Sequence, residues 1–255
     1  MKKVILSLAV VSASLFTTVA SAQISNDKGT FTKPVAGNVL VELQVSPNLA
    51  AGSAFSLNDP LLVNLSNGLD YTNLTSTGTT QDFANLSSVV PALKGRYFLS
   101  DNSALRVQLG MILSSQSIKN SPASGPSTKE TIGRNGFDLI VGYEKHFSGA
   151  ERLSTYAGAD IMFGMVGAKS KVDNGTTTLT AKQSSIGFGL RAVTGFDYYF
   201  IPKVYLGAEL GLGLSYNNYG NVKRSGGALT DITTKTGNFS ITPFLTPAIR
   251  LGYNF

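Results

Sequence analysis

Acidic and basic side chains recur inside segments of this sequence in which apolar residues alternate with polar ones. When such groups are buried together they must form ion pairs, because an unpaired buried charge is very costly. Their near balance in sign predicts a salt-bridged network that fills an interior, and the alternative is a set of charges lining a small ion pore. The residues are Glu42, Lys94, Arg96, Arg106, Asp138, Glu144, Asp160, Arg191, Asp197, Glu209 and Arg250.

Catalytic and metal chemistry have little support in the sequence. The chain has no cysteine and one histidine, which excludes disulfides, thiolate sites and multi-histidine metal centres. His146 has Glu144 two residues away, but no serine stands out as the nucleophile that a triad needs. Asp59, Asp70 and Asp82 lack the close spacing of a calcium loop. We therefore predict no catalytic residue, no metal and no cofactor.

The charged residues must be positioned by strands, because apolar residues recur at every second position. In 104–116, for example, Leu105, Val107 and Leu109 alternate with Arg106 and Gln108. An even number of strands suits a closed single-chain barrel. Long connections rich in Ser, Thr, Asn and Gly are predicted at 46–88, 117–135, 169–182 and 217–237, and they alternate with short turns. Hairpin turn sequences at 173–175 and 225–227 predict that strands five to eight continue as ribbons on the outer side. The predicted strands are 39–45, 89–99, 104–116, 136–147, 153–168, 184–200, 203–216 and 239–255.

The N-terminal residues are predicted not to belong to the fold. Of the 255 residues, 1–22 have the charged start, apolar stretch and Ala-Ser-Ala end of a secretory signal peptide, which predicts Sec-type export. Residues 23–35 would form a periplasmic N-terminal segment, and 36–255 the folded domain. No later segment offers the roughly 20 apolar residues that a spanning helix needs.

The alternation fits both a soluble sandwich and a membrane barrel, and two features favour the barrel. Many glycines lie on the polar face, where small residues relieve crowding in a narrow lumen. Aromatic residues, including Tyr97, Tyr143 and Tyr198, gather near the short turns as at a membrane interface, and Tyr216, Tyr219 and Phe239 could form the opposite girdle. We predict an all-β fold: a closed, antiparallel, transmembrane up-and-down β-barrel with eight strands, or ten if 56–75 adds a hairpin.

The last residues add a resemblance. Segment 249–255, with Leu251, Tyr253 and Phe255, resembles the C-terminal strand of bacterial outer-membrane proteins. The mature chain is similar to the small OmpA-like and OmpX-like barrels, without a periplasmic peptidoglycan-binding domain. This resemblance implies insertion in the outer membrane, with the short turns in the periplasm and the long loops outside. It also implies that the barrel-assembly machinery recognises the C-terminal strand.

The function expected from these features is a non-enzymatic structural or interaction role, carried by the extracellular loops of a barrel with a plugged lumen. A narrow porin is the main alternative. Some barrels of similar size modify lipid A with His, Ser and an acid near the outer half. His146 lies at the other end, so this alternative ranks lower.

The expected partners lie in the cell envelope. Loop 46–88 contains the apolar segment 60–65 and is a candidate dock for an envelope protein, although it could equally pack against the other loops. The outer loops carry a small basic excess, which predicts contact with the phosphates of lipopolysaccharide or with an acidic partner. Ordinary solvated charge is the simpler explanation of that excess. The lipid bilayer is the remaining partner, and nucleic acid has no support.

Overall fold

The protein is described by a computed structural model over residues 33–45, 89–121, 125–147, 150–226, 229–235 and 238–255. In these ranges no helix has the length and apolar character needed to cross a membrane. The predicted signal peptide, loop 46–88 and the alternative hairpin at 56–75 lie outside the described residues, as does most of segment 23–35.

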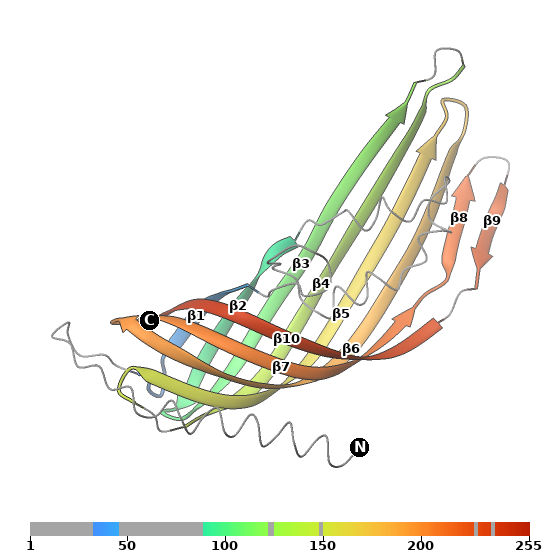
Figure 1. The fold of residues 1–255 in the computed structure, drawn as a ribbon. Helices are drawn as coiled ribbons and strands as arrows, with labels where there is room; N and C mark the ends of the chain where they lie inside the picture. The colour runs from blue at the N-terminus through green and yellow to red at the C-terminus, as the bar shows by residue number, and fades with distance from the viewer. Residues whose placement is uncertain (1–32, 46–88, 122–124, 148–149, 227–228, 236–237) are drawn as a thin grey trace.

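The described chain forms one antiparallel sheet that closes on itself. Eight of its strands form a ring in the order β1-β2-β3-β4-β5-β6-β7-β10, because β10 pairs with both β7 and β1 (Figure 1). The predicted eight-stranded barrel is therefore confirmed. The strands are β1 (Val39–Val45), β2 (Val89–Ser100), β3 (Ser103–Asn120), β4 (Thr128–Phe147), β5 (Leu153–Asp173), β6 (Thr178–Ile201), β7 (Val204–Tyr219), β8 (Val222–Gly226), β9 (Leu229–Thr234) and β10 (Asn238–Asn254).

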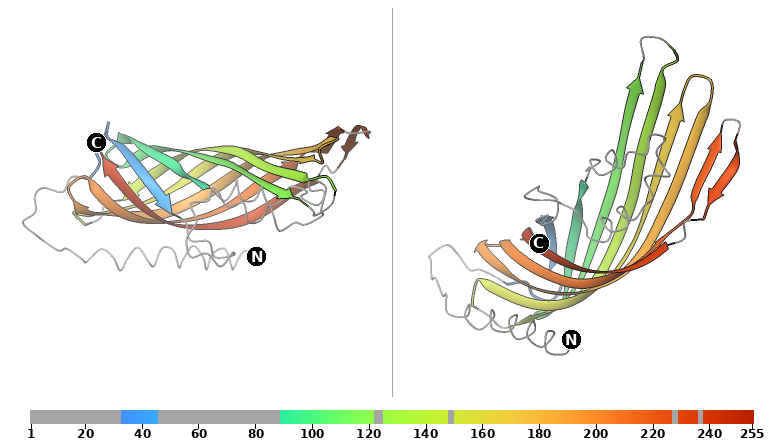
Figure 2. Two further views of the ribbon diagram at one scale, coloured as in Figure 1. Left: turned by 90° about the horizontal axis from the view of Figure 1, so that it is seen from above. Right: turned by 45° about the vertical axis from the view of Figure 1, so that its right-hand side comes forward.

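Several strands run further than their predicted ranges, as the turn sequences at 173–175 and 225–227 predicted for the later strands. Predicted loop 117–135 is mostly strand, since β3 continues to Asn120 and β4 starts at Thr128. Predicted loop 169–182 likewise shortens to 174–177, and 217–237 contains the β8–β9 hairpin, which pairs with β6. Beyond the ring these segments extend the same sheet in the order β3-β4-β5-β6-β8-β9, which Figure 2 shows rising beyond the barrel. We call this part the ribbon sheet.

Local chemistry explains the turns at both ends. β6 and β7 join through Pro202 and Lys203, and the positive φ of Lys203 (69°) is that of the third residue of a type II turn. β5 and β6 join through Asn174 and Gly175, where Asn174 Oδ1 accepts a hydrogen bond of 2.7 Å from the backbone N–H of Thr177. We call the end with Pro202 the short-turn end and the opposite end the ribbon end.

The side chains of each strand alternate between an exposed outer face and a buried inner face. In β1, Val41 and Leu43 are 39% and 57% exposed, whereas Leu40 and Glu42 between them are fully buried. The same pattern runs through β3 to β7 and β10. Apolar side chains therefore cover the outside of the barrel, and its charged residues face inward.

Candidate functional site

The charged residues singled out in the sequence all lie inside the barrel. Their relative exposure ranges from 0% for Glu42, Asp138, Glu144, Asp197 and Arg250 to 5% for Glu209. Every strand of the ring contributes at least one of them. Ten of them are linked by ion pairs into one group, which we call the charge layer: Glu42, Lys94, Arg96, Arg106, Glu144, Asp160, Arg191, Asp197, Glu209 and Arg250.

Arg96 of β2 is at the centre of the charge layer. Its guanidinium lies 2.9 Å from Glu144 Oε1 and 2.8 Å from Asp197 Oδ2, and its Nε pairs with Glu42. It also donates a hydrogen bond of 2.7 Å to the hydroxyl of Tyr205. The planar guanidinium thus connects carboxylates from β1, β4 and β6, which a lysine ammonium at the same position would not match.

Two further arginines each contact three carboxylates. Arg106 of β3 contacts Glu144 at 3.3 Å, Asp160 at 3.0 Å and Glu209 at 2.8 Å. Arg250 of β10 contacts Glu42 at 3.0 Å, as well as Asp197 at 2.6 Å and Glu209 at 3.5 Å. Since each of these carboxylates contacts more than one cation, the charges are compensated as a set.

Some of these contacts cross the whole barrel. In the ring, β2 is opposite β6 and β3 is opposite β7. The pairs Arg96–Asp197 and Arg106–Glu209 therefore join opposite walls. Lys94, at 3.2 Å from Glu209, bridges β2 and β7. The pair Arg191–Asp160, at 2.7 Å, joins only the neighbouring strands β5 and β6.

Inward-facing glycines make room for the large side chains. A Cβ on Gly142 would lie 2.7 Å from the carbonyl oxygen of Ala159 and 2.9 Å from Cγ of Arg106, and it would collide with the carboxylate of Asp160. A Cβ on Gly207 would lie 2.8 Å from the carbonyl oxygen of Phe196. Asp138 is buried in the same way beside Gly110, its backbone partner on β3.

Apolar side chains lie inside the barrel on both sides of the charge layer. At the short-turn end they form one cluster, Leu40, Phe98, Ala104, Tyr199 and Tyr205. Toward the ribbon end lies a second cluster, which begins in the lumen and continues onto the inner face of the ribbon sheet. We call it the inner apolar layer: Ile112, Ile132, Ile140, Met162, Val166, Ala168, Ala181 and Val222, with Phe244 packed against it. Neither cluster was predicted from the sequence, in which the charges and glycines of the inner face indicated a lumen filled by charged residues.

His146 is buried at the short-turn side of the charge layer, where it has an unpredicted partner. Its Nδ1 lies 2.8 Å from the hydroxyl of Ser154, and its Nε2 lies 3.0 Å from Glu144 Oε1. The prediction that no serine partners His146 is wrong, because the β4–β5 hairpin brings Ser154 back on the same inner face. A hairpin register drawn from the short turn at 148–152 could have shown this.

The Ser154–His146–Glu144 arrangement differs from a hydrolytic triad. In the Ser-His-Asp template, Nε2 faces the serine and Nδ1 faces the acid, which is the opposite use of the ring. Glu144 also pairs with two arginines, and Ser154 is only 3% exposed. Within the described residues, no group of three or more His, Asp or Glu side chains is placed to hold a metal ion.

Aromatic residues mark both rims of the outer face. At the short-turn end Tyr97, Tyr143 and Phe147 are 48%, 47% and 52% exposed, as expected of a girdle. At the other rim Tyr216 and Phe239 stack with ring centroids 6.1 Å apart. The expectation for Tyr219 is wrong: this residue is 7% exposed, because it falls on the inner face of β7.

The C-terminal strand closes the ring. The predicted assembly-signal residues Leu251, Tyr253 and Phe255 are 49%, 41% and 63% exposed on the outer face. Leu251 and Tyr253 lie opposite Leu43 and Val41 of β1.

Comparisons with known proteins found a matching family and similar solved structures. Residues 75–255, more than half of the chain, match the OmpA-OmpF-like porin family. The N-terminal β-barrel domain of Pseudomonas aeruginosa OprF is similar in structure, with 12% identity and a TM-score of 0.30 over 87% of this chain and 100% of that one. The attachment invasion locus protein Ail of Yersinia pestis gives 12% identity and a TM-score of 0.31 over the same shares. A search of curated proteins gave no match. The chain therefore belongs to the OmpA-OmpF-like porin family and is an outer-membrane β-barrel protein.

Proposed function

We propose that this protein is a closed, non-conducting barrel that anchors surface-exposed segments in the outer membrane. The observation that carries the proposal is the pair of contacts across the diameter, Arg96–Asp197 and Arg106–Glu209. Side chains fill the interior of eight-stranded barrels in general. In this chain, apolar clusters above and below the charge layer leave its ions little access to water.

Conductance in a planar lipid bilayer tests the closed lumen. We expect the purified wild-type barrel to give no discrete current steps. The double variant Arg106→Ser/Glu209→Ser removes a pair that crosses the diameter and keeps the net charge, so brief openings are expected of it. The control Asp160→Ser/Arg191→Ser removes a pair on one wall and is expected to stay closed. Discrete steps in the wild type would overturn the proposal.

A narrow porin is the second candidate, favoured by the family to which the chain belongs. It requires that the charge layer rearrange to admit ions. Under this alternative the wild type gives regular current steps, and neutralising Arg96, Arg106 or Glu209 changes their size or ion selectivity. The same bilayer recordings therefore separate a plug from a pore.

The surface role is proposed for the ribbon sheet and for loop 46–88, which lies outside the described residues. Outer-membrane barrels place their short turns in the periplasm and their long connections outside. The ribbon sheet carries those connections away from the barrel. Deleting 50–86 is expected to abolish binding of an envelope protein or of another surface partner and to leave the barrel folded. Unchanged partner recovery from crosslinked cells would contradict this role.

A non-enzymatic role is part of the proposal, and Ser154 gives a direct test. The buried hydroxyl and the reversed use of the His146 ring leave no route for substrate to a nucleophile. We expect no release of fatty acid from lipid A by the purified protein, and no difference between wild type, Ser154→Ala and His146→Ala. Turnover that disappears in both variants would show that the barrel is a lipid-modifying enzyme.

The proposal also includes the route by which the protein is exported and assembled in the outer membrane. Residues 1–22 would direct Sec-type export, and the barrel-assembly machinery would recognise Leu251, Tyr253 and Phe255. Phe255→Ala is expected to lower the amount of folded protein in the outer membrane without changing its stability once folded. An unchanged folded fraction in cells would contradict a recognition role for this residue.

A further inference from the structure

Three lysines lie side by side on the outer face of the ribbon sheet. Lys169 of β5 is directly opposite Lys182 of β6, which is directly opposite Lys223 of β8. All three side chains are exposed. Gly133 of β4 precedes Lys169 in the same row. We call Lys169, Lys182 and Lys223 the lysine row.

The lysine row lies just beyond the apolar band of the barrel. The last row with only apolar side chains on the outer face of β3 to β6 is Met111, Phe137, Met165 and Ile186, which are 37–43% exposed. One mixed row follows, and the lysine row comes next. Successive rows on one face are about 7 Å apart along a strand. The ammonium groups are therefore at the height of lipid headgroups if the apolar band spans the hydrocarbon.

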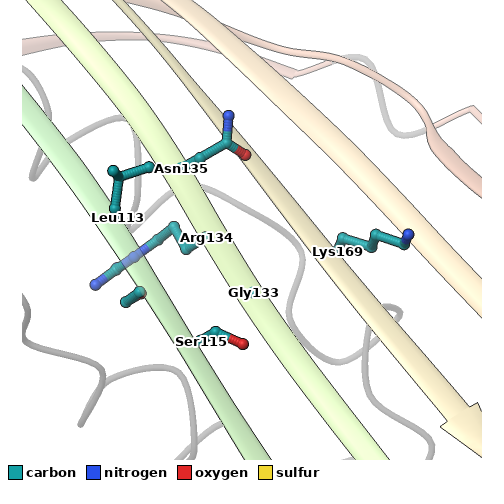
Figure 3. A pocket seen from close by; sticks show the side chains of 7 residues that line it. Leu113, Ser115, Gly133, Arg134, Asn135 and Lys169 are labelled. Carbon is teal, nitrogen blue, oxygen red and sulfur yellow. The ribbon is translucent and has the colours of Figure 1, made fainter.

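An open depression adjoins the lysine row. It has a volume of about 490 Å³, and its lining includes Leu113, Ser115, Gly133, Asn135 and Lys169. In Figure 3, Ser115, Asn135 and Lys169 surround Gly133, whose lack of a side chain leaves the surface hollow. Leu113, at 55% exposure, continues the apolar surface up to this point. The depression thus joins an apolar edge to polar and cationic groups.

On β5, β6 and β8, the outward residues two positions before and after each lysine of the row are not acidic. On the neighbouring strand β9, Asp231 is two residues from Thr233, the backbone partner of Lys223. On the outer face of β5, the first acidic residue is Asp173, and its backbone partner on β4 is Lys129. In the ribbon sheet, the outer faces of β3, β4, β6 and β8 bear no acidic residue at all. Like charges directly opposite each other destabilise a sheet. Two successive Lys–Lys pairs are therefore a cost that a bound anion would remove.

We propose that the lysine row binds the phosphate groups of an anionic glycolipid of the outer leaflet, with lipopolysaccharide as the source. The phosphates would contact Lys169, Lys182 and Lys223, and an acyl chain would follow the apolar surface below Leu113. Lysine binds phosphate as a point charge with three donors and suits a ligand of variable orientation. This inference concerns the outer face and holds whether or not the lumen conducts.

Retention of lipid A by the folded barrel in a neutral detergent tests the proposal. We expect wild type to retain diphosphorylated lipid A through size-exclusion chromatography, as counted by native mass spectrometry. Lys169→Gln/Lys182→Gln/Lys223→Gln is expected to bind it at least ten-fold more weakly, since each lysine near a charged lipid surface contributes to binding. The matched control Lys119→Gln/Lys129→Gln/Lys235→Gln removes three exposed lysines outside the row and is expected to bind like wild type.

Two further arms identify the source of the phosphate. Dephosphorylated lipid A is expected to bind wild type as weakly as the row variant binds the phosphorylated form. Inorganic phosphate at the concentration of the lipid is expected not to displace it. The proposal is wrong if the row variant keeps wild-type affinity, if the control loses as much, or if phosphate removal has no effect. Full displacement by inorganic phosphate would show a free-anion site and would also overturn it.

Discussion

The charge layer and the inner apolar layer are neighbours on the inner face and are carried by overlapping sets of strands, yet they are held together by different forces. The charge layer depends on directed contacts, such as the three carboxylates on Arg96. The inner apolar layer depends on filled volume around residues such as Ile140 and Met162, 2% and 0% exposed. We infer that the charge layer specifies which strands are in contact across the barrel, whereas the inner apolar layer fills the interior volume. The two layers should therefore respond differently to substitution.

The largest effect is expected from Arg96→Met. It leaves Glu42, Glu144 and Asp197 with one cation fewer in a buried site, and removal of one partner from a buried ion pair costs about 3–5 kcal/mol. Urea unfolding of the barrel in detergent micelles, followed by far-UV circular dichroism, measures this loss. Arg96→Lys keeps the charge but not the planar geometry, so we expect a clear loss from it too. A Lys variant as stable as wild type would show that charge alone matters in this layer.

The inner apolar layer should tolerate a change of shape better than a loss of volume. Met162→Ala is expected to cost about 2–5 kcal/mol, since the site is fully buried and a cavity remains. Met162→Leu conserves volume and is expected to cost less than about 1.5 kcal/mol. The same unfolding experiment applies. If Met162→Leu were as damaging as Arg96→Lys, the contrast between directed and volume-filling contacts would fail.

The sequence predicted the charge layer far better than the inner apolar layer, for a physical reason. A charge between apolar neighbours, such as Arg106 between Leu105 and Val107, reveals which face is inward. Ile140 and Met162 are apolar residues on the inner face, and their neighbours on the outer face are apolar too. The alternation therefore does not distinguish the two faces at these positions. These residues form a layer because side chains from other strands pack against them. The sequence of a single strand does not show those contacts.

The pairing across the barrel was also beyond the sequence. Which acid meets Arg106 depends on strand stagger and closure, and these follow from the whole ring. The ribbon sheet was predicted only for the later strands, because 117–135 is rich in Ser, Thr and Gly, a composition typical of loops. Backbone pairing such as Ser117 with Thr131 forms strands there even so, since neither face has to be apolar outside a membrane. By contrast, the alternation of apolar and polar residues at every second position was enough to predict the number of strands in the ring and the inward face of each strand.

A smaller loss of stability is expected where side chains of the charge layer pack closely against a glycine. In Gly142→Ala the new methyl group meets the Asp160 carboxylate and Cγ of Arg106, so a loss of about 1–3 kcal/mol follows from overpacking. Gly95→Ala is the matched control, because its Cβ would meet only the carbonyl oxygen of Leu40, at 3.6 Å. We expect this control to change stability by less than about 0.5 kcal/mol. Equal losses at both glycines would show that strand backbone, not the charge layer, sets the cost.

The smallest effect is expected at Lys203, whose turn lies outside both layers. A non-glycine residue in the left-handed region costs about 1–2 kcal/mol, and the greater chain entropy of glycine in the unfolded state returns about 0.5–1 kcal/mol of any gain. Lys203→Gly should therefore raise the free energy of unfolding by up to about 1 kcal/mol, because φ is 69° there. Urea unfolding with the lipid and detergent held fixed measures this gain. A loss of stability would mean that the Lys203 side chain contributes more than its backbone costs. In that case the turns, and not only the two interior layers, hold the short-turn end together.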